Sequence, residues 1–140
     1  MNCWILNVGC KIGCEMERKY DLDDRCVTFG AAIVKFTDQL PRSMAGIHLG
    51  KQLLRSGTAP ALHYGEVQGA ESIADFLHKM KVALKELRES KNNMRIQEKA
   101  GLLNASKTDH AWLLMECNEL IAIFTSSIKT AQANAAGRKK

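Results

Sequence analysis

Residues 22–40 read LDDRCVTFGAAIVKFTDQL and carry a regular helical pattern. Its apolar side chains recur at alternating spacings of four and three residues, at Leu22, Cys26, Phe29, Ile33, Phe36 and Leu40. That spacing is typical of a helix with one face in the core of a bundle. Carboxylates at its beginning, from Asp21 onward, suit the free amides and the positive end of the helix dipole. Pro41 is expected to stop the helix, because the residue before proline avoids the α region.

The segment after Ser43 predicts a second helix that reaches about residue 68. Its apolar side is expected to consist of Ile47, Leu53 and Leu54. Pro60 lies inside this segment and removes a backbone hydrogen bond. We therefore expect the helix to be interrupted and kinked between Arg55 and Pro60.

Two longer helices are expected downstream. The third spans about residues 70–99 and ends at Gly101, and the fourth begins at a cap formed by Thr108 or Asp109. Their core positions are expected to be Phe76, Met80, Ala83, Leu87 and Met94, and then Leu113, Cys117, Leu120, Phe124 and Ile128. Both sets repeat with helical period, which indicates two further amphipathic helices.

The 140 residues suit one domain. Four amphipathic helices with short connections predict an all-α, antiparallel, up-down-up-down four-helix bundle with a kinked second helix. We divide the chain into a poorly ordered N-terminal extension (1–19), the bundle (20–132) and a basic tail (133–140). Residues 1–15 show no regular period. They are explained either by an upstream start codon, with Met16 as the natural start, or by an arm that packs on the body.

Five cysteines are present, and three of them lie within the first fourteen residues. This odd and uneven set disfavours a disulfide framework, and no second pair is placed to complete a zinc site. Reduced thiols predict a cytoplasmic protein. No apolar run approaches the roughly 18 residues of a membrane span, so we expect no membrane contact.

Twenty basic and fifteen acidic residues give a net charge of +5, which permits an anionic partner. Five cations of the expected third helix fall in one narrow sector of the helical wheel: Lys81, Lys85, Arg88, Arg95 and Lys99. Acidic residues fall about a quarter turn away. Two interpretations stay open. The cations contact phosphates of a nucleic acid, or they cover the apolar face and pair with acids of a neighbouring helix.

No arrangement typical of catalysis, metal binding or cofactor binding stands out in the sequence. We therefore predict a protein that is not an enzyme and holds no cofactor or metal. Glu66 and His63 share one helical face. We expect Glu66 to be at least half-buried and paired with Arg55 or nearby backbone. Cys26 and Cys117 are expected to be small core residues.

Three segments carry a resemblance to a known family. They are residues 52–66 (QLLRSGTAPALHYGE), 70–89 (AESIADFLHKMK, then ALKELRE after one residue) and 119–124 (ELIAIF). Over about residues 20–131 the chain resembles the bacterial four-helix bundle proteins first described as encoded in intervening sequences of 23S ribosomal RNA genes. It departs from them at His63, where members often have Asn, and in its first fifteen residues.

The resemblance implies an antiparallel bundle that assembles into a ring, typically a homopentamer. It also implies kinship with the accessory variability protein of diversity-generating retroelements, a basic pentameric barrel that binds nucleic acid and a reverse transcriptase. It brings no catalytic residues. It implies that Arg55, together with the basic positions of the third helix, contacts nucleic acid or lies at a subunit interface.

Two hypotheses of function follow. In the first, a homo-oligomeric bundle binds RNA or DNA through its basic surface, as an accessory to a reverse transcriptase or in association with ribosomal RNA. In the second, the protein is an interaction scaffold whose cations make ion pairs between subunits, with apolar contacts from Leu77, Leu84 and Ile121. A small helical enzyme or metal binder is a third alternative.

Overall fold

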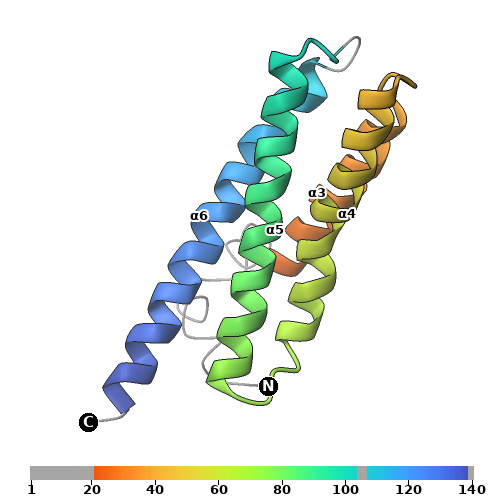
Figure 1. Ribbon diagram of the computed structural model, residues 1–140. Coiled ribbons are helices and arrows are strands. Elements are labelled where there is room, and N and C mark those ends of the chain that lie inside the picture. Colours follow the sequence, from red (N-terminus) through yellow and green to blue (C-terminus); the bar gives the residue numbers. More distant parts are fainter. Residues whose placement is uncertain (1–20, 104–106, 139–140) are drawn as a thin grey trace.

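The computed structural model describes residues 21–103 and 107–138, and over these ranges it contains four α-helices and no strand. The helices are α3 (Leu22–Asp38), α4 (Met44–Val67), α5 (Ile73–Lys99) and α6 (Lys107–Arg138). This confirms the all-α class and is consistent with a four-helix bundle (Figure 1). The predicted extension at residues 1–19, with its two explanations, lies outside the described residues.

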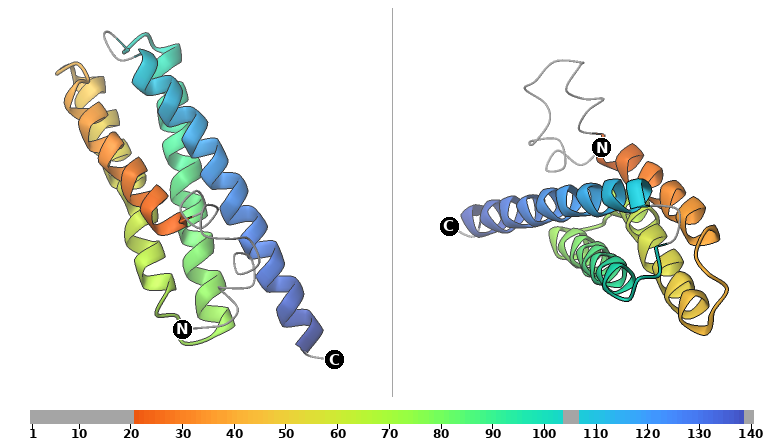
Figure 2. Two further views of the ribbon diagram at one scale, coloured as in Figure 1. Left: turned by 180° about the vertical axis from the view of Figure 1, so that it is seen from behind. Right: turned by 90° about the horizontal axis from the view of Figure 1, so that it is seen from above.

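Each helix packs against the next one along the chain, and α3 also contacts α6. Helix α4 ends and α5 begins at one end of the molecule, whereas α5 ends and α6 begins near the other (Figure 1). The view along the helices shows that the C-terminal part of α6 extends away from the other three (Figure 2). One side of α5 is left exposed along its length.

Polar side chains begin three of the helices. The Asp21 carboxylate accepts a hydrogen bond from the amide of Asp24 at 3.1 Å, and Ser43 Oγ accepts one from Gly46 at 3.1 Å. Both caps confirm the prediction. In α5 the cap is Ser72, whose Oγ accepts from Asp75 N at 3.0 Å, so the helix begins three residues later than expected.

In the connection between α5 and α6, one end was predicted correctly and the other was not. Gly101 has φ 71° and follows α5, which confirms a glycine at the end of that helix. Helix α6 begins at Lys107, ahead of Thr108 and Asp109. The predicted cap at either of those two positions is therefore wrong, because both lie within the first turn.

The apolar seams predicted for three helices are buried. They consist of Cys26, Phe29, Ile33 and Phe36 in α3, Phe76, Met80, Ala83, Leu87 and Met94 in α5, and Leu113, Cys117, Leu120, Phe124 and Ile128 in α6. Leu22 and Leu40 are partly buried against this core. Each large side chain removed from water contributes roughly 1.5–3 kcal/mol, so these seams dominate the stability of the fold.

Helix α4 packs differently from the prediction. Leu53 is buried, but Ile47 and Leu54 are exposed. The rest of its buried side is made largely of small residues, namely Gly46, Gly50, Ser56, Gly57 and Ala59. A Cβ at Gly57 would lie 2.8 Å from the Ile33 side chain, so α3 and α4 approach too closely there for a larger residue. The predicted apolar side of the second helix is therefore right at Leu53 and wrong at Ile47 and Leu54.

The predicted interruption of the second helix is also wrong. Helix α4 runs without a break from Met44 to Val67, with a buried Pro60 inside it. Just before the proline, the hydroxyl of Thr58 donates to the carbonyls of Leu54, at 2.7 Å, and Arg55, at 3.3 Å. A bend at Pro60 stays a prediction.

Helix α6 continues to Arg138, so residues 133–138 are helical and not a separate tail. Its segment Asp109–Arg138 is long and apolar enough to cross a membrane, by length and composition, with a mean hydropathy of 1.2 over an 18-residue window. The expectation that composition excludes a span is wrong by this criterion. In the fold, Leu113, Leu120 and Phe124 of this helix are buried in the bundle core, and a core helix reaches the same hydropathy.

Candidate nucleic-acid interface

The five predicted cations of α5 lie in one line on its exposed side. We call Lys81, Lys85, Arg88, Arg95 and Lys99 the α5 basic row. All five are exposed, and the exposed side chains of His78 and Asn92 continue the same line. The seven positions are three or four residues apart, which places them along one face of the helix.

No residue of the α5 basic row forms an ion pair with a described carboxylate. The ion pairs found within residues 21–103 and 107–138 involve Arg25, Arg55 and Lys79. Within the row, Arg95 Nη1 donates to Asn92 Oδ1 at 3.3 Å, a neutral partner. The interpretation in which neighbouring helices of the same chain neutralise the row therefore finds no support in these contacts.

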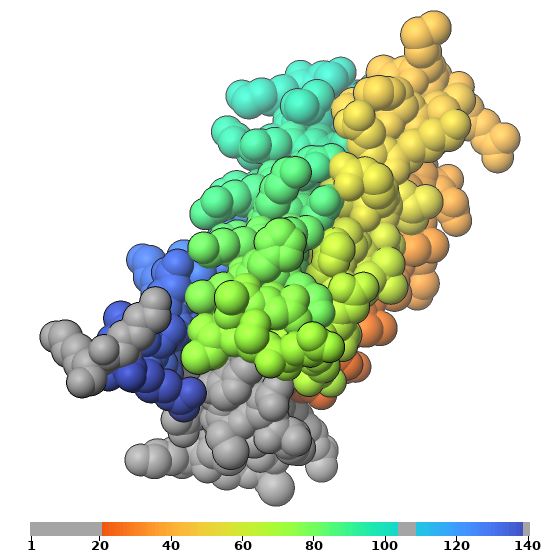
Figure 3. All heavy atoms as spheres, turned by 60° about the horizontal axis from the view of Figure 1, so that its bottom comes forward, coloured from red at the N-terminus to blue at the C-terminus, as the bar shows by residue number. Residues whose placement is uncertain are grey.

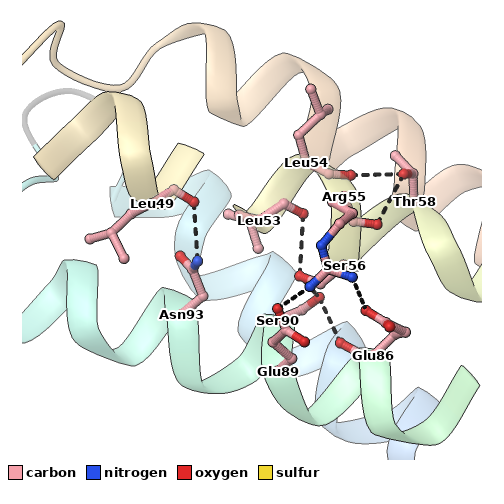
Figure 4. Close-up of polar contacts among 10 residues, drawn as sticks. All are labelled: Leu49, Leu53, Leu54, Arg55, Ser56, Thr58, Glu86, Glu89, Ser90 and Asn93. Carbon is pink, nitrogen blue, oxygen red and sulfur yellow. Dashed lines mark hydrogen bonds and ion pairs between the residues drawn. The ribbon is translucent and has the colours of Figure 1, made fainter. Parts of the chain in front are cut away.

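Arg55 is placed differently from the row. Its guanidinium donates from α4 to Glu86 Oε2 of α5 at 3.0 Å and also to the Glu89 carboxylate (Figure 4). The hydrogen bond to Glu89, followed by the charge of Glu86, raises the pKa of Arg55 above its ordinary value. Arg55 therefore neutralises two of the acids that lie beside the row.

Glu66 does not take part in these contacts. It is exposed, and the partners of Arg55 are Glu86 and Glu89. The expected pairing of Glu66 with Arg55 is therefore wrong. The side chains that α4 and α5 place opposite one another lie far apart in the chain, which local spacing does not reveal.

Buried polar contacts hold the inner side of α5 against α4. Ser90 Oγ lies 2.9 Å from Ser56 Oγ, and Asn93 Nδ2 donates to the carbonyl of Leu49 at 3.0 Å (Figure 4). Within α5, the Gln97 amide donates to Asn93 Oδ1 at 2.6 Å and so orients the Asn93 side chain. Because buried polar groups are costly unless paired, these contacts fix how α5 is turned and thus which side faces outward.

A second charged cluster, which the sequence reasoning missed, joins α3 to α6. Arg25 Nε and Nη2 each lie 2.9 Å from an oxygen of Glu116, and Nη2 lies 2.6 Å from Glu119. Hydrogen bonding to Glu116 is the main cause that raises the pKa of Arg25. The three-residue spacing of the two acids was a signal for one partner on a neighbouring helix, but it did not identify Arg25.

The remaining polar features offer no metal centre in the part of the chain that the structure describes. His110 is buried, with Nε2 3.0 Å from the carbonyl of Met94. Burial raises the pKa of each thiol, Cys26 and Cys117, to about 12, so both stay protonated as core residues. A depression of about 920 Å³ beside Leu114 and Met115 has mainly apolar walls.

Exposed apolar side chains lie elsewhere than predicted. Leu84 is buried, and Leu77 and Ile121 pack partly against the core, so they are not a free apolar patch. The exposed apolar side chains of α3 and α4 are Val27, Val34, Met44, Ile47, Leu54 and Leu62. Leu84 therefore cannot supply the predicted apolar contact between subunits, because it belongs to the core, whereas a contact through the partly buried Leu77 and Ile121 stays a prediction.

Comparison with known proteins supports the resemblance. Residues 18–126 match the family described as 23S rRNA-intervening sequence protein. No curated protein matches the chain. Among solved structures, the fold is similar to the crystal structure of a protein with unknown function from the S23 ribosomal protein family of Bacteroides thetaiotaomicron. The two chains are 26% identical, with a TM-score of 0.70 over 77% of this chain and 98% of that one. The chain thus belongs to the 23S rRNA-intervening sequence protein family.

Proposed function

We propose that the protein is a non-enzymatic, cytoplasmic, homo-oligomeric bundle of antiparallel helices that binds nucleic acid through the α5 basic row. The observation that carries the proposal is a line of five exposed cations without an ion-pair partner among the described carboxylates. Exposed cations without partners are the groups that release counterions from a phosphate backbone. The family's association with ribosomal RNA genes, or a role beside a reverse transcriptase, would supply such a ligand.

The α5 basic row is long enough to contact several phosphates. From Lys81 to Lys99 the helix rises by roughly 27 Å. Each phosphate that is neutralised contributes a salt-dependent term to affinity and no sequence information. The pairing of Arg55 with Glu86 and Glu89 supports the proposal, because these acids then repel a phosphate less.

A charge-matched pair of variants tests the proposal. In the row variant, Lys81, Lys85 and Arg88 are replaced by alanine. In the control variant, the exposed lysines Lys35, Lys51 and Lys129 of other helices are replaced by alanine, which removes the same charge. We measure the affinity of each full chain for a structured ribosomal RNA fragment by mobility shift in about 0.1 M salt.

The row variant, which can no longer neutralise three phosphates, is expected to bind roughly 100-fold or more weakly at this salt concentration. The control variant is expected to stay within a few-fold of the parent chain. Equal reductions in the two variants would show that net charge, and not the row, governs binding. Absence of any complex with the parent chain would overturn the proposed function.

A protein-interaction scaffold is the second candidate, because α3 and α4 expose apolar side chains such as Val34, Leu54 and Leu62. In that case the row makes contacts between subunits. The row variant would then lower the oligomer mass in multi-angle light scattering and leave affinity for nucleic acid unchanged. We expect the opposite result, with the mass unchanged and the affinity reduced.

A further inference from the structure

The α5 basic row is straight and rigidly held. All five cations belong to one unbroken helix, and the side chains of α5 project in a line from one edge of the molecule (Figure 3). On the inner side, Ser90 and Asn93 bind α4, so the row cannot turn toward a ligand without breaking buried hydrogen bonds. A ligand that already holds its phosphates in a regular, stiff array fits such a row at the lowest cost in conformational entropy.

Partners for base stacking are missing from the row. Proteins that hold single strands combine a cationic groove with aromatic side chains on which successive bases stack. All four phenylalanines of the described chain are buried, and Tyr64 is half-buried. Trp112 is 39% exposed but lies on α6. Among residues 21–103 and 107–138, the only ring in line with the row is that of His78 at its N-terminal end.

We infer that the ligand of the α5 basic row is double-stranded nucleic acid, contacted along its phosphate backbone without sequence readout. The inference rests on the proposed function and narrows its ligand class. A duplex presents a phosphate charge about every 1.7 Å of its axis, a higher charge density than a single strand offers. RNA and DNA duplexes share this chemistry, so the experiment includes both.

The direct test compares three ligands in fluorescence anisotropy with the full chain. They are an RNA duplex and a DNA duplex of two helical turns, about 20 base pairs each, and an oligouridylate strand of the same length. In the same salt, the duplex with the higher affinity is expected to bind at least tenfold more tightly than the strand, and which duplex this is identifies the source of the phosphates. A strand whose affinity lies within tenfold of that of the tighter-binding duplex overturns the inference and leaves the proposed function intact. No binding to any of the three overturns the proposed function itself.

A gain-of-function variant tests the stacking argument separately. Asn92→Trp puts an aromatic ring in the middle of the row at an exposed position. Stacking of one base raises the affinity for oligouridylate by about fivefold or more, whereas the affinity for the duplexes is expected to change by less than about twofold. An unchanged affinity for oligouridylate, or an equal rise for all three ligands, would contradict the argument. Circular dichroism of the variant confirms that the helices are retained.

Discussion

Arg25 and the α5 basic row show two different uses of positive charge in one small molecule. Arg25 is mostly enclosed between α3 and α6 and binds two carboxylates, with 20% of its side chain exposed. The row is exposed along α5 and has no ion pair with the described carboxylates. Surroundings, and not residue type, therefore separate the cations that stabilise the fold from the cations that stay exposed and without an ion pair among the described residues. The two sets should respond oppositely to substitution.

The largest effect on stability is expected for Arg25→Met. The change leaves Glu116, with 11% of its side chain exposed, without its main partner. Loss of the partner of a largely buried carboxylate lowers the unfolding free energy by about 2–3 kcal/mol, which is less than at a fully buried site. Urea unfolding measures the loss, and Glu116→Gln in the same background should recover part of it. Affinity for nucleic acid should not change. A loss below about 0.5 kcal/mol would show that Arg25 does not stabilise the fold.

The buried thiols are expected to make the stability of the fold depend on pH in the alkaline range. Cys26 and Cys117 have pKa values of about 12 in the fold, whereas a thiol in an unfolded chain ionises near 8.5. Their contribution to stability is complete below the unfolded pKa and is lost as pH rises toward 12. We expect a loss of about 2 kcal/mol per thiol by pH 10.

Denaturation curves between about pH 8 and about pH 10, from just below the unfolded thiol pKa to well above it, measure this loss. The control is the double variant Cys26→Ala and Cys117→Ala, whose stability should depend less on pH over the same range. If the parent chain and the double variant show the same pH dependence, ionisation of these thiols does not lower the free energy of unfolding.

Arg55→Met is expected to have a smaller effect than Arg25→Met, because Arg55 and its pairs with Glu86 and Glu89 lie near the surface. Thermal denaturation compares the two variants. Affinity for nucleic acid should nevertheless fall, because two acids beside the row lose their partner. Adding Glu86→Gln and Glu89→Gln should restore the affinity. If it does not, Arg55 contacts the ligand directly.

The smallest effect on stability is expected for the row itself. Replacing Lys81, Lys85 and Arg88 by alanine removes exposed side chains without ion pairs, so unfolding free energy should change by less than about 0.5 kcal/mol per substitution. Urea unfolding of the row variant against the parent chain checks this. A larger loss would place these cations with Arg25 as parts of the fold.

Much of the fold could be predicted because heptad spacing is a local signal. The seam from Cys26 to Phe36 and the caps at Asp21 and Ser43 depend on residues within a few turns of one another. Helix α4 was harder, since its inner side is defined by close approach at Gly57 and not by large apolar side chains. The start of α6 was placed too late, because polar residues at 108 and 109 resemble a cap although the helix already includes them.

The candidate site was predictable in part for the same reason. The row follows from the period of one helix, so its five positions could be read from the sequence. The partners of Arg55 lie 31 and 34 residues away, and the partners of Arg25 lie 91 and 94 residues away. Such pairs depend on how the helices are arranged and turned, which no local pattern contains.

The salt dependence of duplex binding shows how many phosphates the α5 basic row neutralises. We measure log K against log salt concentration for the parent chain and for the row variant at Lys81, Lys85 and Arg88. If these cations neutralise phosphates, the slope becomes shallower by about 2.7, or about 0.9 for each cation replaced. Parallel lines for the two chains would contradict the claim that the exposed, unpaired row on α5 holds the nucleic acid.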